Sequence, residues 1–196
     1  LGKGKIAFKD AKWDIRWTVK LGSLCYGNPT VAGGKVFIGT NDRFWSDPRV
    51  KRSRGGLLLC IDDATGKVLW RLLTPRYKEK IYNSGFDDLN VGICSAVTID
   101  GDKAYVVSNR AEVLCLDVNG QANGNDGPYR DEGKYMAPES KDPVKLYGGD
   151  GDIIWRFDMI EDLENAPHDA ANCNILAHGD LLYVNTSNGV HRRPDE

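Results

Sequence analysis

The sequence predicts an all-β protein, specifically an incomplete β-propeller built from four-stranded antiparallel blades. Glycine makes up 22 of the 196 residues, as expected of a chain with many tight turns. A hairpin pattern occurs three times, and two of the hairpins are followed by a second pair of strands that ends on a tryptophan. Four short strands per unit, with an aromatic residue recurring at one place, are typical of propeller blades.

The three hairpins lie in residues 28–41, 95–109 and 174–188. Each consists of a short apolar run, a turn containing glycine or aspartate, and a run of β-branched or aromatic residues. Phe37, Tyr105 and Tyr183 mark the centre of the second strand in the three copies.

The second pair of strands is clearest in residues 56–70, where a turn from Asp62 to Gly66 leads to a strand that contains Trp70. Residues 112–120 begin in the same way, but the strand with Trp155 arrives only after an insertion at residues 118–151. Residues 13–22 have the pattern of a closing strand, with Trp17 in the place of Trp70 and Trp155.

These units predict one complete blade over residues 26–72, a second over residues 93–157, and parts of two others. The third blade begins near Cys173, and residues 13–22 supply the leftover strand. Apolar runs without alternation, at residues 57–61 and 113–116, are expected where neighbours cover both faces of a sheet. Because a propeller needs roughly 4 to 8 blades, residues 1–196 are expected to be a section of one propeller domain.

Composition excludes several classes of protein. With 41% hydrophobic residues, the chain is expected to form a packed core, and a net charge of -2 argues against a dedicated nucleic-acid binder. The longest apolar run, residues 57–61, is too short to span a membrane.

The five cysteines are too few for a disulfide scaffold. Cys60 and Cys115 precede equivalent turns, whereas Cys94 and Cys173 begin hairpins. We expect cysteine to serve here as a small apolar side chain, reduced and buried.

Residues 60–70, Cys-Ile-Asp-Asp-Ala-Thr-Gly-Lys-Val-Leu-Trp, are similar to the Ala-x-Asp-x-x-Thr-Gly-Lys-x-x-Trp signature of the pyrroloquinoline quinone (PQQ) type repeat. The second copy keeps Asp117, Gly120 and Trp155 but lacks the threonine and lysine. Residues 28–29, 39–41, 125–128 and 186–190 resemble a subgroup of bacterial PQQ-binding-like propeller proteins, often of planctomycete type. The resemblance extends over residues 13–190.

This resemblance implies a periplasmic or otherwise extracytoplasmic protein. The function expected first is a non-catalytic binding or scaffold domain that contacts protein partners through its loops. The alternative is part of an alcohol or sugar dehydrogenase that uses PQQ and calcium. Such dehydrogenases hold PQQ on the propeller axis between an aromatic floor and a disulfide of adjacent cysteines, and no two cysteines are adjacent in this chain.

The insertion supplies oxygen ligands of the kind that calcium prefers. The candidate ligands are Asp117, Asn119, Asn123, Asn125 and Asp126. Their spacing departs from the EF-hand loop, because Ala122 stands where glycine is needed and Pro128 where glutamate belongs. A solvated loop held by turns that Asn and Asp side chains stabilise is favoured over this calcium site.

His168, Cys173 and His178 are evenly spaced, as zinc ligands can be. A structural zinc site normally needs four ligands, and Asp169 is the only close addition. We therefore expect no zinc here, and we expect His178 to face water in a hairpin turn.

A basic cluster lies in another loop between strands and consists of Arg49, Lys51, Arg52 and Arg54. Asp42 and Asp47 are close in sequence, and the only stacking aromatics nearby are Phe44 and Trp45. A solvated loop is favoured over an anion or nucleic-acid site.

Overall fold

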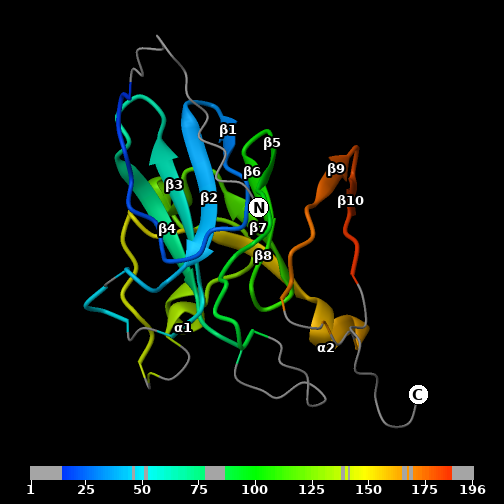
Figure 1. Cartoon of the computed structure of the whole chain (residues 1–196). Helices are drawn as coiled ribbons and strands as arrows, with labels where there is room; N and C mark the ends of the chain where they lie inside the picture. The colour runs from blue at the N-terminus through cyan, green and yellow to red at the C-terminus, as the bar shows by residue number, and fades with distance from the viewer. Residues whose placement is uncertain are drawn as a thin grey trace, which may run out of the picture.

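The computed structural model describes residues 15–45, 47–50, 53–77, 87–137, 140, 142–164, 167 and 170–186. It consists mostly of β-strands in three antiparallel sheets, none of which closes on itself (Figure 1). The first sheet contains β1 (Thr30–Ala32), β2 (Lys35–Asn41), β3 (Gly56–Asp62) and β4 (Val68–Thr74). The second contains β5 (Thr98–Asp100), β6 (Lys103–Val107), β7 (Glu112–Asp117) and β8 (Ile153–Asp158). A hairpin of β9 (Leu176–His178) and β10 (Leu181–Tyr183) forms the third.

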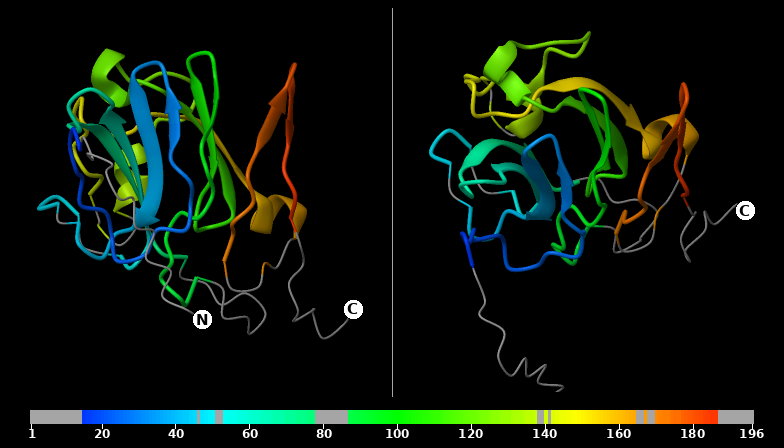
Figure 2. Two further views of the ribbon diagram at one scale, coloured as in Figure 1. Left: turned by 45° about the horizontal axis from the view of Figure 1, so that its top comes forward. Right: turned by 90° about the horizontal axis from the view of Figure 1, so that it is seen from above.

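The sheets follow one another in chain order. In both four-stranded sheets, each strand pairs with the next strand along the chain. The two sheets and the hairpin stand side by side, and the first strands adjoin, with β1 contacting β5 and β5 contacting β9 (Figures 1 and 2). The all-β prediction is confirmed at this level.

The strand register confirms the equivalences predicted between the two sheets. In the first sheet, Cys60 pairs with Phe37 on one side and Trp70 on the other. The second sheet places residues of the same kinds in the same register: Tyr105, Cys115 and Trp155.

A β-bulge precedes each of these tryptophans. The register shifts between Cys60 and Ile61 in the first sheet, and between Cys115 and Leu116 in the second. A bulge adds a residue to one strand and changes the direction of the side chains beside it. The two tryptophans therefore leave their sheets from the same local geometry.

The third strand of each four-stranded sheet, β3 or β7, lies at the centre of the core. Residues 57–61 and 113–116 are all buried, which confirms that both faces of these strands are covered. A strand covered on both faces needs no alternation of polar residues.

Trp70 joins the first sheet to the second. Its indole Nε1–H donates to the Val118 carbonyl at 3.0 Å, and a Cβ placed on Gly120 would lie 2.7 Å from its ring. Gly120 has a φ of 58°, so both the backbone conformation and the close approach require glycine.

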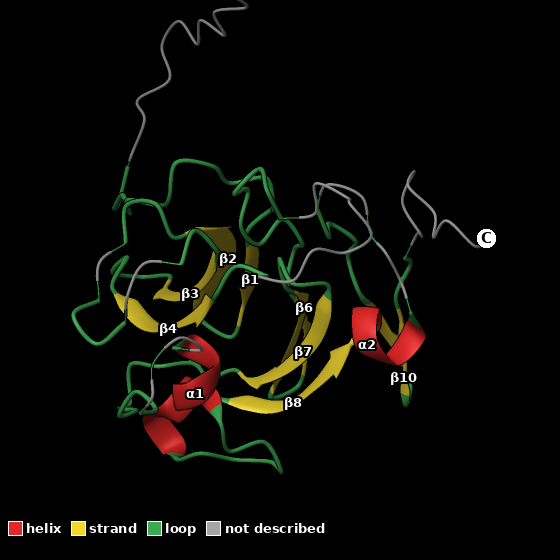
Figure 3. Cartoon of the chain, turned by 90° about the horizontal axis from the view of Figure 1, so that it is seen from below, coloured by secondary structure: helices red, strands yellow, loops and turns green. Residues whose placement is uncertain are grey.

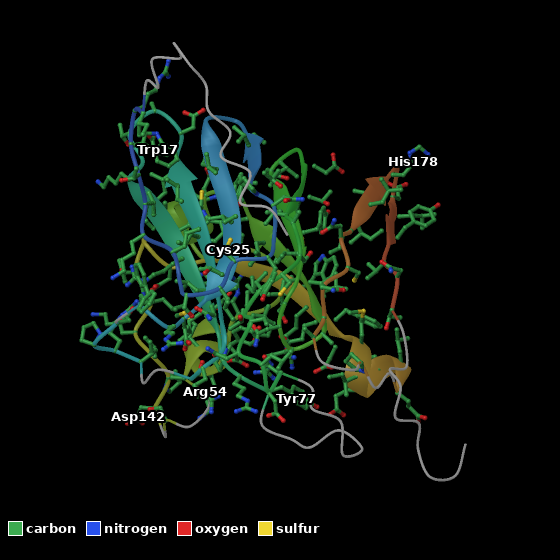
Figure 4. The ribbon with its side chains drawn as sticks, in the orientation of Figure 1. Trp17, Cys25, Arg54, Tyr77, Asp142 and His178 are labelled. Carbon is green, nitrogen blue, oxygen red and sulfur yellow. The ribbon has the colours of Figure 1, made fainter. Side chains whose placement is uncertain are left out.

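Trp17 makes the same contact one unit earlier. Its indole donates to the Asp63 carbonyl at 2.8 Å, and its ring lies against Gly66, which has a φ of 72°. Asp62 and Asp117 are both the last residues of their strands, so Asp63 and Val118 occupy equivalent positions. Figure 4 shows Trp17 on the segment before β1.

A second contact between units is also repeated. The Thr30 hydroxyl donates to the Val97 carbonyl at 2.6 Å, and the Thr98 hydroxyl donates to the Ile175 carbonyl. Each threonine begins the first strand of its sheet, and each acceptor directly precedes the first strand of the next. The step from unit to unit therefore uses equivalent donors and acceptors.

The expectation of a strand at residues 13–22 is wrong for residues 15–22, which contain no strand; residues 13 and 14 lie outside the described residues. A strand requires a neighbour for its backbone groups, and no described strand pairs with this segment. Side chains hold the segment instead, because Trp17 donates to Asp63 and the backbone of Ser23 donates to the Asn41 amide oxygen at 2.9 Å.

The described helices are short and lie outside the sheets: η1 (Gly120–Asn123), α1 (Glu132–Met136) and α2 (Met159–Leu163). Figure 3 shows α1 near β4 and β8, and α2 at the end of β8. Asp158 starts α2 by accepting from the backbone of Ile160 and Glu161. None of the helices in the described segments has the length and hydrophobicity needed to cross a bilayer.

We expect Trp70→Ala to lower the free energy of unfolding by roughly 3–5 kcal/mol, because it leaves a cavity between the two sheets. Trp70→Phe keeps a ring but loses the hydrogen bond to Val118, and this loss should cost about 1 kcal/mol or more. Urea unfolding followed by circular dichroism measures both changes. Leu181→Ala, at a position 59% exposed, is the control and should stay within about 0.5 kcal/mol. A Trp70→Ala variant as stable as the control would contradict this role.

Candidate functional site

The insertion between β7 and β8 is an ordered part of the core. Glu132, Tyr135, Met136 and Val144 are buried, and α1 contacts β4 of the first sheet. The expectation of a solvated loop is therefore wrong for this part of the insertion. Its apolar residues follow neither a helical nor a strand period, so their burial could not be predicted from the sequence.

Three of the five predicted calcium ligands lie together. The Asn123 amide donates to Asp117 Oδ2 and to Asp126 Oδ2, at 3.3 Å in both cases. Asp117 is 5% exposed and also accepts from the Asn119 backbone at 2.6 Å. Two carboxylates therefore face one amide group at the start of the insertion.

The other two candidates are directed elsewhere. The Asn125 amide nitrogen donates to Glu132 Oε2 at 2.9 Å, and its oxygen accepts from Arg130. The Asn119 side chain is exposed. Among the described residues, no group of three or more His, Cys, Asp or Glu side chains is arranged to hold a metal ion. Calcium binding by Asp117, Asn123 and Asp126, with their amide and carboxylate oxygens, stays a prediction.

A buried pair of carboxyl groups, Glu132 and Asp152, was not predicted. Both side chains are fully buried. Asp152 accepts from the Asp126 backbone at 2.8 Å and from Gln121 at 3.3 Å, and Glu132 accepts from the Ile153 backbone at 3.2 Å. Burial, together with the negative charge of Glu132, raises the pKa of Asp152 to about 6. Asp152 therefore keeps its proton to a higher pH than an ordinary aspartate does.

Arg49 connects the loop after β2 to the end of the insertion. Its guanidinium donates to both oxygens of Asp150, each at 2.8 Å, and to Asp47 at 2.7 Å. Asp150 is fully buried. The hydrogen bond to Asp150 is the main reason that the pKa of Arg49 is raised, and the Arg49 hydrogen bond likewise holds the pKa of Asp47 well below its usual range.

Arg71 extends this ion-pair network. It donates to Asp47 at 2.7 Å, and its guanidinium lies over the rings of Trp45 and Tyr147. The expectation of a solvated basic loop is therefore wrong for Arg49, which pairs with Asp150, distant in sequence, as well as with the nearby Asp47. Arg54 is exposed as expected, whereas Lys51 and Arg52 lie outside the described residues.

Glu112 is the centre of a second buried network. It accepts from the Tyr135 hydroxyl at 2.6 Å, from Arg156 at 2.7 Å and from the Ser108 hydroxyl at 3.1 Å. Burial, and then the charge of Glu112, raise the pKa of Tyr135 well above its usual value. Because hydrogen-bond donors surround this carboxylate, its role is structural: it holds α1 against β7 and β8.

Equivalent asparagines lie at the end of the second strand in the two four-stranded sheets: Asn41 is the last residue of β2, and Asn109 follows the end of β6 by two residues. The Asn41 amide donates to the Asn90 carbonyl at 2.8 Å, and the Asn109 amide donates to Asp87 at 3.0 Å. Asp87 also accepts from the Tyr77 backbone at 2.9 Å, and burial raises its pKa to about 6. These buried amides tie the connections between units to the strand ends.

The structure describes all five cysteines as free thiols. Cys60 and Cys115 are buried as predicted, and burial raises the pKa of these thiols to about 12 and about 11. The prediction of burial is wrong for Cys25, which is exposed on the segment before β1 (Figure 4). Cys94 and Cys173 are half-buried. High thiol pKa values make the two buried cysteines poor nucleophiles.

Of the three evenly spaced residues, His178 is exposed at the tip of the β9–β10 hairpin, as predicted (Figure 4). Cys173 packs beside the core that contains Val113 and Met159. His168 lies outside the described residues.

A cavity of about 390 Å³ opens where the segments before β1, β5 and β9 meet. Its polar lining comes from three asparagines, Asn28, Asn172 and Asn174, and from Cys94. Tyr26, Leu89 and Val91 supply apolar and aromatic surface. Lys, Arg, Asp and Glu are absent from this lining, as far as the structure describes it.

This cavity does not fit PQQ. PQQ carries several carboxylates, and buried carboxylates require cationic or hydrogen-bonded partners. The described lining offers no cation, and its cysteine, Cys94, has no adjacent cysteine. We therefore derive no reaction through this cofactor.

No family model matches the chain, and no curated protein matches its sequence.

Replacing Arg49 should destabilise the protein by removing the partner of a buried charge. Removing one partner of a buried pair costs roughly 3–5 kcal/mol, and we expect Arg49→Met near the lower end because Arg49 is 24% exposed. The double variant Arg49→Met, Asp150→Asn should lose less than the sum of the two single variants. Urea unfolding measures these changes, with the exposed Lys145→Ala as control. Additive losses would contradict a direct pairing.

The pair of carboxyl groups predicts that stability falls as the pH rises. The folded pKa of Asp152, about 6, exceeds the ordinary value of 3.8, so the folded chain binds this proton more tightly than the unfolded chain. This stabilisation is full below about pH 4 and is lost as the pH rises through about 6. Glu132→Gln replaces the neighbouring carboxyl group by an amide that can donate a hydrogen bond to Asp152. This variant should therefore reduce the loss of stability that urea unfolding measures between these two pH values.

Asp87→Asn is the matched control for this pH experiment. Asp87 also has a pKa raised to about 6, but it lies outside the pair, so the contribution of Asp152 should persist in this variant. A Glu132→Gln variant with the same pH dependence as the parent chain would rule out an effect of Glu132 on the pKa of Asp152.

Proposed function

We propose that the chain is a section of a PQQ-like β-propeller with no catalytic role, which acts as a binding or scaffold domain. In this proposal the two four-stranded sheets are consecutive blades, and β9 and β10 begin a third. The observation that carries it is the repeated contact of Trp17 with Asp63 and of Trp70 with Val118.

Both contacts join a tryptophan indole to the carbonyl that directly follows the third strand of a sheet, which supports a similar step from one unit to the next. A repeated step of this kind generates a ring when it closes. The threonine contacts of Thr30 and Thr98 support the same step, because they join the first strands of successive units. The repeat signature at residues 60–70 adds support, since it supplies the turn that receives Trp17.

The pairing of the buried ionisable side chains supports the binding role. Arg49, Asp150 and Glu112 hold the insertion and the connections in place through paired charges. A rigid framework with fixed loops is suited to recognition of a partner. We propose protein partners contacted through these loops, in an extracytoplasmic location that rests on the resemblance alone.

The alternative, part of a quinoprotein dehydrogenase, is less well supported. It would require cationic side chains for the carboxylates of PQQ, and the described cavity lining contains none.

A titration with PQQ and calcium distinguishes the two functions. We expect no saturable heat of PQQ binding at micromolar concentration, and no PQQ-dependent reduction of a dye with alcohols or aldoses as substrates. A PQQ-dependent dehydrogenase assayed in parallel serves as the positive control. Micromolar binding of PQQ, or turnover above the rate without protein, would overturn the scaffold proposal and favour the dehydrogenase.

A further inference from the structure

We propose that the cavity between the segments before β1, β5 and β9 binds a neutral, cyclic sugar of about one ring. Its volume of about 390 Å³ falls within the roughly 300–1,000 Å³ typical of small-molecule sites. Figure 2 shows these three segments next to one another at one end of the sheets. The site therefore collects side chains from three successive units.

The amide groups in this cavity are free to bind a ligand. Within the described residues, the side chains of Asn28 and Asn172 make no hydrogen bond to the protein. Asn174 is fixed in place, because its oxygen accepts from the Ala96 backbone at 2.8 Å. Each primary amide presents a donor and an acceptor in one plane, and each sugar hydroxyl is both a donor and an acceptor.

The charge and shape of the lining select the class of ligand. A charged ligand would lose its hydration in a site whose described lining offers it no opposite charge. Tyr26 and Leu89 are 64% and 58% exposed, and together with Val91 they offer apolar surface next to the amides. A pyranose ring has an apolar C–H face and a polar edge, so it matches both kinds of surface.

A peptide fits this lining less well. Extended peptides are usually bound by adding a strand to a free sheet edge or by filling a long groove. The residues that line this cavity lie outside the strands, and the neighbouring cavity beside Met159 and Asn185 is only about 100 Å³. A compact ligand therefore suits the site better than an extended chain.

This proposal rests on the binding role proposed above and names a ligand for one part of it. Calorimetry and saturation-transfer NMR on the intact chain, with glucose, galactose and N-acetylglucosamine as probes, test it. We expect saturable binding of at least one sugar with a Kd of about 1 mM, the affinity expected of a small neutral ligand.

Three further probes test the ligand class. Glucuronate carries a charge, sorbitol is acyclic, and a capped alanine dipeptide offers only amides, so we expect each of them to bind more weakly than the best sugar. Equal or tighter binding of any of these three would overturn the assignment to a neutral cyclic sugar.

Substitutions locate the site. Asn28→Ala and Asn172→Ala should each weaken binding about 5–10-fold, because each removes a hydrogen-bonding group. Both side chains are exposed and make no described hydrogen bond, so folding should be unaffected, as circular dichroism can verify. Asn119→Ala, at an exposed asparagine in the insertion, is the matched control and should bind as the parent chain does.

The proposal is overturned if no sugar binds saturably at tens of millimolar, or if both cavity variants bind as well as Asn119→Ala. The PQQ titration decides the scaffold role separately. Absence of sugar binding together with absence of PQQ turnover would remove this site and leave the scaffold proposal standing.

Discussion

The arrangement of the sheets depends on the fit of a tryptophan against the turn of the next unit. Trp70 can donate to Val118 only because Gly120 leaves room for its ring, and Gly120 also adopts a φ that other residues rarely tolerate. The bulge before Trp70 sets the direction of this side chain. A bulge, a tryptophan and a turn glycine therefore act together to set the position of the second sheet relative to the first.

The order of the insertion follows from the same contact. Because Trp70 lies against Gly120, the first residues of the insertion are held close to β4. At its other end, Asp150 accepts hydrogen bonds from Arg49 of the loop after β2, and the Arg71 backbone carbonyl accepts from Gly151 at 2.7 Å. An insertion held at both ends loses less entropy when its middle packs, so the burial of α1 becomes favourable.

The sequence predicted the positions that repeat and missed the contacts that occur once. The second sheet repeats three positions of the first, so that Tyr105, Cys115 and Trp155 correspond to Phe37, Cys60 and Trp70. They recur because each position has the same environment in both sheets. The pairs Arg49–Asp150 and Glu132–Asp152 have no second copy and join residues far apart in sequence, so local patterns could not predict them. The strand expected at residues 15–22 failed for a related reason, since a strand depends on a partner as well as on its own residues.

These contacts also separate the groups that maintain the fold from those available for recognition. In the insertion, Asp150 pairs with Arg49 of the loop after β2, and Glu132 accepts from Asn125 and from the Ile153 backbone. A ligand there would have to displace these hydrogen bonds. The amides of Asn28 and Asn172 have no such partners within the described residues, so a ligand displaces only water. These two amides lie where the segments before β1, β5 and β9 meet, and this is the place that the structure offers to a ligand.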